Sequence, residues 1–290
     1  MSRIMRIGID SYCYHRYFGE VYPDQSDPGM RWTSEDFLDR ASELGVSGVS
    51  LESCFLGPLD QAFLEELKSI LDKKGLERVF AWGHPDGLEG GRNEDAWRQM
   101  NSLIPKARAL GARVMRIVAS SLKFRFEPHE PQIKAIVRLL KESVKVARDF
   151  DVILAIENHI DYTSSEILQI LEQVNSDNLR VNFDTGNALR LMEDPVAAAR
   201  RLGPYVVATH LKDVDSCRHV PPEEWFFFSS VPVGTGLIDI AGVITELKKS
   251  GYNGMLAIES DHHKDNQDED KLVEKSVTYL KNVLRDLDVA

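Results

Sequence analysis

Residues 133–159 hold one complete helix-and-strand unit, with the sequence IKAIVRLLKESVKVARDFDVILAIENH. In residues 133–147 apolar side chains recur every three or four positions, which is the spacing of an amphipathic helix. Residues 152–157 form a short, almost wholly apolar run that ends on a carboxylate, and this predicts a buried strand. A helix joined to a strand that is apolar on both faces is typical of a parallel sheet covered by helices.

The same unit recurs along the chain. Eight short apolar runs are predicted to be strands: residues 6–10, 48–52, 77–82, 113–119, 152–157, 179–184, 205–211 and 255–259. Amphipathic segments separate them, and end signals support these segments as helices: Thr33 or Ser34 is placed to cap the first, and Gly75 follows another. Eight such repeats in 290 residues predict a single (β/α)8 TIM barrel, with residues 1–290 as one domain. A doubly wound sheet is the alternative.

The composition excludes several classes of protein. With 46 acidic and 35 basic side chains the net charge is −11, which opposes binding to a nucleic-acid backbone. The apolar runs fall short of the roughly 18 residues of a membrane-spanning helix. The segment MSRIMRIGID lacks the features of a secretory signal, so a cytoplasmic protein is expected. The distant Cys13, Cys54 and Cys217 offer neither a disulfide framework nor a thiolate metal site.

Two connections, residues 11–32 and 213–236, are longer than ordinary barrel loops, and no regular structure is predicted within them. Both are rich in aromatic residues, which disordered segments lack. In a barrel both would rise from the carboxyl ends of the strands, where the active sites of barrel enzymes lie. We therefore expect them to form a pocket wall or lid, and to be candidate contacts of a homo-oligomer.

Four polar residues end late strands of the predicted barrel: Glu157, Asp184, His210 and Glu259. A single acid at a strand end is more often a helix cap or a surface residue, but four in succession favour a shared site. Because strand ends converge in a barrel, three carboxylates would repel one another there unless a cation lies among them. Three oxygen donors and one imidazole favour Mn²⁺ or Mg²⁺ as the cofactor, with Co²⁺ or Zn²⁺ as alternatives.

Five motifs surround these residues: IENH at 156–159, FDTGN at 183–187, THLKD at 209–213, GTGLID at 234–239 and AIES at 257–260. Together they resemble the xylose isomerase-like TIM-barrel superfamily of sugar phosphate isomerases and epimerases, also called AP endonuclease family 2. The resemblance implies that Glu157, Asp184, His210 and Glu259 bind one divalent metal ion. It also implies that the catalytic residues are Glu157 and Glu259, which move protons.

The chemistry of such a site can be stated from its donors. A metal that holds a carbonyl oxygen and a neighbouring hydroxyl stabilises the enediolate formed when the adjacent C–H loses its proton. Glu157 is placed to take that proton, and Glu259 to return one to the other face. We therefore predict a divalent-metal-dependent sugar isomerase or epimerase that acts on a small polyhydroxylated carbonyl compound.

Two alternatives stay open. The first is a metal-dependent lyase of the same superfamily, such as a decarboxylase of a 3-oxo sugar acid, a dehydroshikimate-type dehydratase or a C-glycoside-cleaving enzyme. The second is a non-catalytic sugar-binding or partner subunit, against which the intact pair of Glu157 and Glu259 argues. In each case the expected partner is a small carbohydrate or sugar acid, with no nucleic acid and no membrane.

Five further residues are candidates for substrate binding: His84, His159, Asn187, Lys212 and Arg218. His159 and Lys212 each lie two positions after a predicted metal ligand, and so share its side of the strand. His84 follows the third predicted strand. Arg218 is the weakest of the five, because an ordinary ion pair explains it equally well.

The chain departs from the ketose 3-epimerases of the superfamily at two positions. Those proteins carry a histidine where Asn187 stands and an acid where Thr163 stands, so the resemblance argues less for a free ketose substrate. Glu52 and Arg116 are weaker candidates, because an ordinary ion pair explains each of them equally well. The GTG stretch at 234–236 lacks the context of a phosphate loop and predicts a turn before a helix.

Overall fold

The computed structural model describes residues 5–263 and 268–289. Eight parallel strands close into a barrel: β1 (Arg6–Asp10), β2 (Gly48–Glu52), β3 (Glu77–Ala81), β4 (Val114–Ile117), β5 (Ile153–Glu157), β6 (Leu179–Asp184), β7 (Val206–Leu211) and β10 (Met255–Ile258). Each pairs with its neighbour along the chain, and β10 pairs with β1 to complete the ring. The predicted TIM barrel is therefore confirmed, and each predicted strand lies within two residues of its observed bounds.

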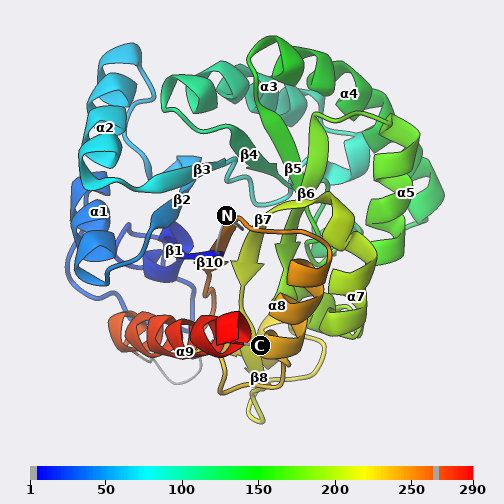
Figure 1. Cartoon of the computed structure of the whole chain (residues 1–290). Helices are drawn as coiled ribbons and strands as arrows, with labels where there is room; N and C mark the ends of the chain where they lie inside the picture. The colour runs from blue at the N-terminus through cyan, green and yellow to red at the C-terminus, as the bar shows by residue number, and fades with distance from the viewer. Residues whose placement is uncertain (1–4, 264–267, 290) are drawn as a thin grey trace.

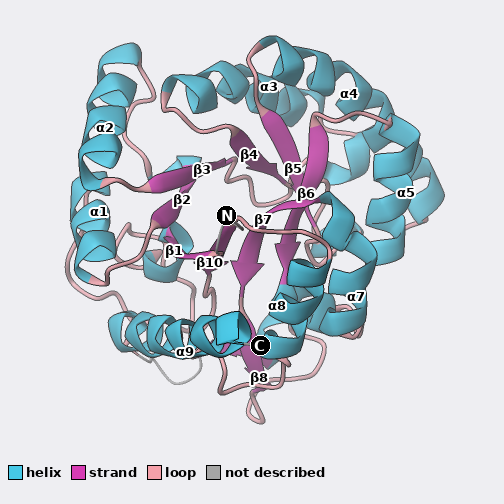
Figure 2. Cartoon of the chain, viewed as in Figure 1, coloured by secondary structure: helices cyan, strands magenta, loops and turns pink. Residues whose placement is uncertain are grey.

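Helices surround the strands on the outside (Figures 1 and 2). They are α1 (Ser34–Glu43), α2 (Gln61–Lys74), α3 (Glu94–Ala109), α4 (His129–Asp149), α5 (Ser164–Val174), α6 (Thr185–Arg190), α7 (Pro195–Leu202), α8 (Ile240–Lys249) and α9 (Glu269–Val289). Thr33 caps α1, as one of the two predictions had it, because its hydroxyl accepts from the backbone of Asp36. Gly75 ends α2 in the left-handed conformation with a φ of 67°, which explains the glycine there.

The barrel interior below the carboxyl ends of the strands is filled by small and apolar side chains. They form a cluster apart from the large core between strands and helices: Val79, Ala208, Met255 and Ala257. At the amino ends of the strands, Arg6 Nη2 lies 2.8 Å from Glu77 Oε2 in an ion pair. A packed interior of this kind leaves the carboxyl ends of the strands as the place for a polar site.

The prediction that the two long connections lack regular structure was wrong. Residues 11–32 contain a short 3₁₀ helix, Ser11–Tyr14. The connection at 213–236 departs further from the prediction. It contains two antiparallel strands, β8 (Asp213–Ser216) and β9 (Phe228–Val231). Contacts distant in sequence hold this hairpin: the Ser230 amide donates to the His262 carbonyl at 2.8 Å, and the Ser230 hydroxyl donates to Asp261 at 2.8 Å. The sequence pattern within the connection cannot indicate contacts with residues so distant along the chain.

The GTG stretch forms the predicted turn. Gly234 has a φ of +90°, a conformation that favours glycine. The amides of Gly234 and Gly236 donate to Asp213 Oδ2 at 2.9 and 2.8 Å. A carboxylate of the chain itself thus occupies the amides that a phosphate loop would offer to a ligand.

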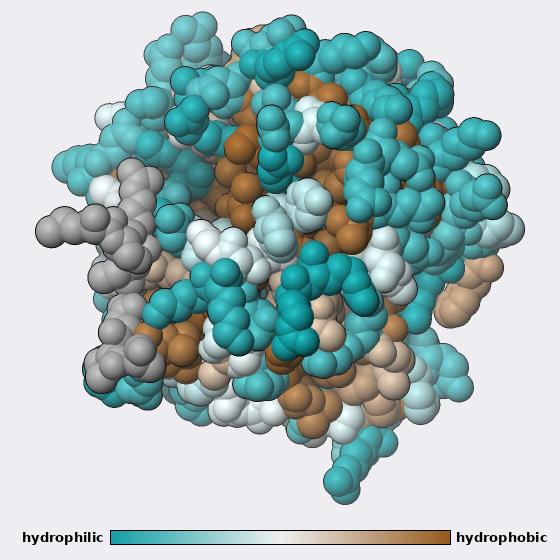
Figure 3. Space-filling model, turned by 45° about the vertical axis from the view of Figure 1, so that its right-hand side comes forward, coloured by the Kyte–Doolittle hydropathy of each residue, from teal (hydrophilic) through white to brown (hydrophobic). Residues whose placement is uncertain are grey.

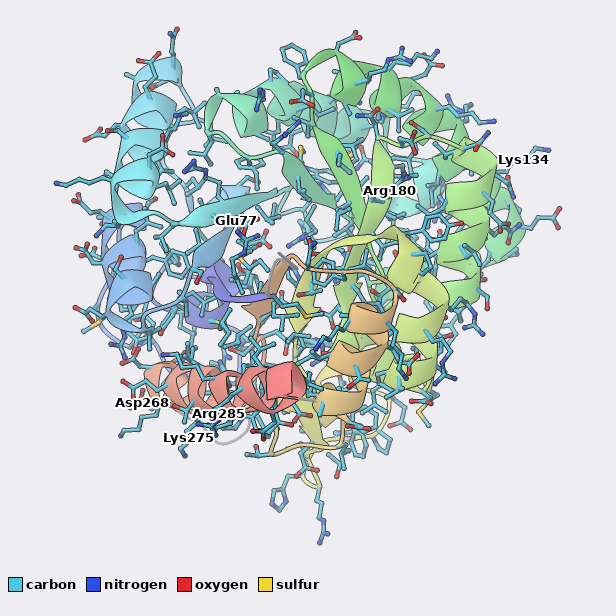
Figure 4. All side chains as sticks on the ribbon, in the orientation of Figure 1. Glu77, Lys134, Arg180, Asp268, Lys275 and Arg285 are labelled. Carbon is cyan, nitrogen blue, oxygen red and sulfur yellow. The ribbon has the colours of Figure 1, made fainter. Side chains whose placement is uncertain are left out.

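The outer surface is mainly polar. On the face drawn in Figure 3 hydrophilic residues predominate, and hydrophobic ones show as separate patches. Figure 4 shows Glu77 and Arg180 inside the ring of helices, whereas Lys134 and Lys275 lie on its outer side. Within residues 5–263 and 268–289, the helices lack the combination of length and hydropathy that crossing a membrane requires.

Candidate metal centre

The structure brings together the four residues that end the late strands. Glu157 and Asp184 are the last residues of β5 and β6, His210 lies in β7, and Glu259 directly follows β10. These strands are consecutive neighbours in the barrel, so their carboxyl ends converge. One potential ligand atom from each residue lies within 4.8 Å of the others, and all four side chains are buried.

The donor atoms surround a common point. His210 Nδ1 lies 3.3 Å from Glu259 Oε2 and 3.5 Å from Glu157 Oε1. Its distance to Asp184 Oδ2 is 4.0 Å. Among the described residues, Asp184 Oδ2, His210 Nδ1 and Glu259 Oε2 are buried without a hydrogen-bond partner. Buried polar atoms are normally satisfied, so this convergence fits a single divalent ion with mainly oxygen ligands.

Lys212 supplies part of the positive charge beside this cluster. Its Nζ lies 2.9 Å from Glu259 Oε2 and 3.3 Å from Asp184 Oδ2, at angles that do not make hydrogen bonds. The same Nζ donates a hydrogen bond to Asp261 at 2.8 Å. Lys212 is therefore anchored by Asp261, and the unsatisfied atoms of the cluster remain available to an ion.

Asp10, at the end of β1, lies behind His210 and was missed by the sequence analysis. Its Oδ2 is 3.4 Å from His210 Nε2, on the side of the ring opposite the cluster. Its Oδ1 accepts from the Tyr12 amide at 2.6 Å, which fixes the carboxylate. A carboxylate at the second nitrogen of a histidine ligand orients the ring and raises its basicity. The available signal was that Asp10 ends a predicted strand, as the four cluster residues do.

Replacing Asp10 by Asn is expected to weaken divalent-metal affinity by about 10- to 100-fold, because His210 loses its orienting carboxylate. Asparagine can still accept from the Tyr12 amide, so the local turn should survive. Isothermal titration of the metal-free protein with Mn²⁺ measures the effect. Asp60→Asn is the control, since Asp60 is an exposed cap of α2. If the variant binds Mn²⁺ as tightly as the wild type, Asp10 does not support metal binding through His210.

Charges around the cluster keep two of its carboxyl groups ionised. Burial by itself would raise the pKa of Glu157, but the charges of Arg116 and His210 outweigh it and lower this pKa to about 2. Burial would likewise raise the pKa of Glu259, yet His210 and Lys212 bring it well below its usual range. Both groups are thus carboxylates at neutral pH and can accept protons.

The other two residues hold protons when no metal is bound. Burial raises the pKa of Asp184 to about 8, against the opposing charge of Lys212. Burial alone would lower the pKa of His210, but Glu259 and Glu157 raise it well above its usual value. A metal ligand must be an ionised carboxylate or a neutral imidazole, so ion binding has to displace these protons.

We expect metal binding at pH 7 to release about two protons per ion, one each from Asp184 and His210. Because the pKa of His210 is raised well above its usual value and that of Asp184 to about 8, both groups lose their protons more readily as the pH rises, and the affinity should increase from pH 6 to 8. Calorimetric titration in two buffers of different ionisation enthalpy counts the protons. A pH-independent affinity with no proton release would contradict these pKa shifts.

A cavity of about 570 Å³ opens above the cluster. As expected, both long connections supply its wall, with Tyr12 and Tyr22 from one and Trp225 from the other. The rings of Tyr22 and Trp225 meet edge to face, 5.5 Å apart between centroids. The two connections thus touch one another beside the cavity.

Four of the five predicted substrate-binding residues line this cavity: His84, His159, Asn187 and Lys212. Asn187 Nδ2 donates to Glu157 Oε1 at 3.1 Å, and His159 Nδ1 has no hydrogen-bond partner among the described residues. Arg218 is not among the lining residues, and its side chain is exposed. The hairpin carries Arg218 to the surface, so the structure places it apart from the other four candidates. Thr163 caps α5 instead of facing the cavity.

Two buried ion pairs flank the cluster. Glu52 and Arg116, two of the weaker candidates, pair with each other, and both line the cavity; Arg116 Nε also lies 3.2 Å from Glu157 Oε2. Sequence analysis missed the second pair, in which Arg190 donates to Asp261 at 2.6 and 3.0 Å. The position of Asp261 two residues after Glu259 was a signal for it, since alternate residues tend to share a side.

Comparison with known proteins agrees with this architecture. Residues 38–283 match the family model described as xylose isomerase-like TIM barrel. A 3-oxo-isoapionate decarboxylase of Pectobacterium atrosepticum is 26% identical over 238 residues, 81% of this chain and 78% of that protein. An inosose dehydratase of Erwinia tasmaniensis is 25% identical over 264 residues, 79% of this chain and 87% of that protein. A solved L-ribulose 3-epimerase superposes with a TM-score of 0.75 at 20% identity, covering 97% of this chain and 95% of that one, which supports the fold.

Proposed function

Because the chain belongs to the xylose isomerase-like TIM-barrel family, we propose that it is a divalent-metal-dependent isomerase or epimerase of a small polyhydroxylated carbonyl compound. One observation carries this proposal. Of the four clustered residues, Glu157 and Glu259 line the cavity, whereas Asp184 and His210 do not. The two carboxylates that can reach a substrate are therefore the two that remain ionised, so each is able to accept a proton.

The four residues Glu157, Asp184, His210 and Glu259 would hold the ion. When bound, a divalent ion supplies positive charge that stabilises negative charge developing on the oxygen of a substrate carbonyl. The remaining chemistry belongs to side chains of the cavity.

Glu157 is oriented to act as the base. Asn187 Nδ2 donates to its Oε1 at 3.1 Å, and Arg116 Nε lies 3.2 Å from its Oε2. Held in this way, the carboxylate takes a proton from the carbon next to the carbonyl. Glu259, with Lys212 Nζ 2.9 Å from its Oε2, takes up a proton from water and delivers it to the other face, while the proton on Glu157 passes to the solvent. Return to the same carbon on the opposite face inverts it, and return to the neighbouring carbon isomerises the compound.

Solvent deuterium tests this proposal. The metal-loaded protein is incubated in D₂O with a panel of free ketoses and cyclic keto-polyols, and each compound is recovered and analysed by NMR. The proposal predicts deuterium at the carbon beside the carbonyl, together with a new epimer or isomer. If no compound of the panel exchanges a proton while the protein carries its metal, the proposal fails.

A metal-dependent lyase is the second candidate. It is favoured by the curated relatives named as a dehydratase and a decarboxylase, and by Asn187 and Thr163, which depart from the ketose 3-epimerase pattern. The same base would begin the reaction, but a hydroxyl or carboxyl group would then leave. The product distinguishes the two, because a lyase yields water and an unsaturated ketone, or CO₂, in place of an isomer of the same mass.

A further inference from the structure

We propose that the substrate carries no charge, so that it is a polyhydroxylated carbonyl compound with neither a phosphate nor a carboxylate group. This inference rests on the proposed function, and it chooses among the substrate types that the function leaves open. The inference rests on one arrangement: every arginine and lysine among the described residues of the cavity wall already contacts a carboxylate of the chain.

On one side of the cavity the cations are Arg116 and Lys123. Arg116 is buried, pairs with Glu52 and contacts Glu157, so its guanidinium lies between two carboxylates. Lys123 Nζ donates to Asp86 Oδ2 at 2.6 Å. At the buried Arg116, an anion would have to compete with two carboxylates that already hold the guanidinium, which costs the new interaction much of its energy. Lys123 is exposed, and its pair with Asp86 reduces the positive potential that it offers to a ligand.

On the other side the cations are Arg190 and Lys212, and Asp261 satisfies both. Arg190 donates to its two carboxylate oxygens in a bidentate pair, and Lys212 donates at 2.8 Å. A second Arg190 contact, to the Phe228 carbonyl at 2.8 Å, fixes the guanidinium against β9. The guanidinium also lies 5.2 Å from the ring centroid of Trp225. This side of the wall therefore presents a satisfied network and not a free cation.

The net charge of the cavity wall also disfavours an anionic substrate. Its described residues include six carboxylates, Glu20, Glu52, Asp86, Glu157, Glu259 and Asp261, against the four cations named above. The formal surplus is thus negative, and a divalent ion in the cluster would do no more than cancel it. An anionic substrate would meet no net positive potential, whereas binding sites for phosphate and carboxylate groups usually supply an unpaired arginine or lysine.

Among the described residues, the glycine turn after β7 offers no phosphate cradle. In this fold phosphate is frequently bound by loops after the last two strands of the barrel. The GTG turn lies in one of these loops, but the amides of Gly234 and Gly236 are taken by Asp213. That internal carboxylate leaves the turn no donors for a phosphate.

The groups that are free in the cavity suit hydroxyls and carbon-bound hydrogens. His159 Nδ1 has no partner among the described residues, and Tyr12, Tyr22 and Trp225 add aromatic side chains to the wall. The Tyr12 hydroxyl is bonded to Glu20 and to the Tyr22 hydroxyl, so the two tyrosines offer a ligand mainly their apolar rings. A neutral polyol presents the matching pattern of hydroxyls and C–H edges.

Calorimetric titration of the metal-loaded protein with three non-reactive ring compounds tests the inference. The probes are myo-inositol, which is neutral, quinate, which is a ring polyol with a carboxylate, and myo-inositol 1-phosphate. We expect myo-inositol to bind at least tenfold more tightly than either anion. Equal affinities, tighter binding of an anion, or no binding of myo-inositol would each overturn the inference.

Two variants sharpen this test. Asp86→Asn frees Lys123 while keeping an acceptor for the Ser121 hydroxyl, so the affinity for quinate should rise about two- to fivefold relative to that for myo-inositol. Asp95→Asn makes the same change of charge at an exposed position on α3 outside the cavity wall and should alter neither affinity. If Asp86→Asn binds quinate no more tightly than the wild type, the ion pairs of the cavity wall do not set the preference for a neutral ligand.

The outcome is separable from that of the proposed function. Protein that exchanges deuterium into a substrate but prefers anions would overturn the charge inference alone. Protein that prefers myo-inositol but exchanges no proton with any ketone would overturn the proposed function and leave the charge preference standing.

Discussion

Glu157→Gln is expected to lower kcat by about 10²- to 10⁴-fold, because an amide cannot take the proton that the carboxylate takes. The shape of the side chain is kept, and its Oε1 can still accept from Asn187, which donates at 3.1 Å in the native protein. Turnover of the best compound from the deuterium panel is measured at saturating metal and substrate. Metal content is determined on the same sample, since Glu157 also belongs to the cluster.

The matched control is Glu94→Gln, which makes the same change at an exposed residue of α3. It should retain the turnover of the wild type. If Glu157→Gln loads metal and turns over within threefold of the wild type, Glu157 is not the base and the proposed chemistry is wrong.

Asp184→Asn is expected to weaken binding of the divalent ion by at least about 100-fold. This effect is larger than that expected for Asp10→Asn, because Asp10 contacts a ligand of the ion and not the ion itself. Asp184 has two separable roles. Its Oδ1 caps α6 by accepting from the Asn187 amide at 2.7 Å, and its buried Oδ2 faces the cluster without a hydrogen-bond partner. Asparagine keeps the cap and removes the charge, so the loss should appear in metal affinity and not in folding.

Asp194→Asn is the control for this change. Asp194 caps α7 through the Val196 amide in the same way, but it is exposed and lies outside the cluster. Titration with Mn²⁺ measures affinity, and circular dichroism checks that both variants are folded. Should the folded Asp184→Asn protein bind the ion as tightly as the Asp194→Asn protein, Asp184 would not be a ligand.

The barrel was predictable because its strands are short apolar runs that alternate with segments whose apolar residues recur at helical spacing. In β5, burial on both faces leaves almost no position for a polar residue until the strand ends, so Glu157 stands out. The same reasoning singled out Asp184, His210 and Glu259, and barrel geometry required their strand ends to converge. Fold and cluster therefore follow from one pattern, apolar strands that end in polar side chains.

The remainder of the site depends on contacts between distant parts of the chain. Arg190 and Asp261 are 71 residues apart. Strand period can place Asp261 on the side of Glu259, but nothing in the sequence indicates that Arg190 is its partner. The β8–β9 hairpin is held by Asp261 and by the residue that follows it, so its own sequence gives little sign of pairing. Arg218 shows the converse, because a charged residue close to a motif can still be carried to the surface by a turn.

Anomalous diffraction from crystals grown with Mn²⁺ tests most directly whether the four side chains hold one ion. The account predicts a single anomalous peak at about 2.0–2.6 Å from one donor atom each of Glu157, Asp184, His210 and Glu259. A map with no peak between these side chains, or with the ion bound elsewhere on a protein that is active with metal, would contradict it.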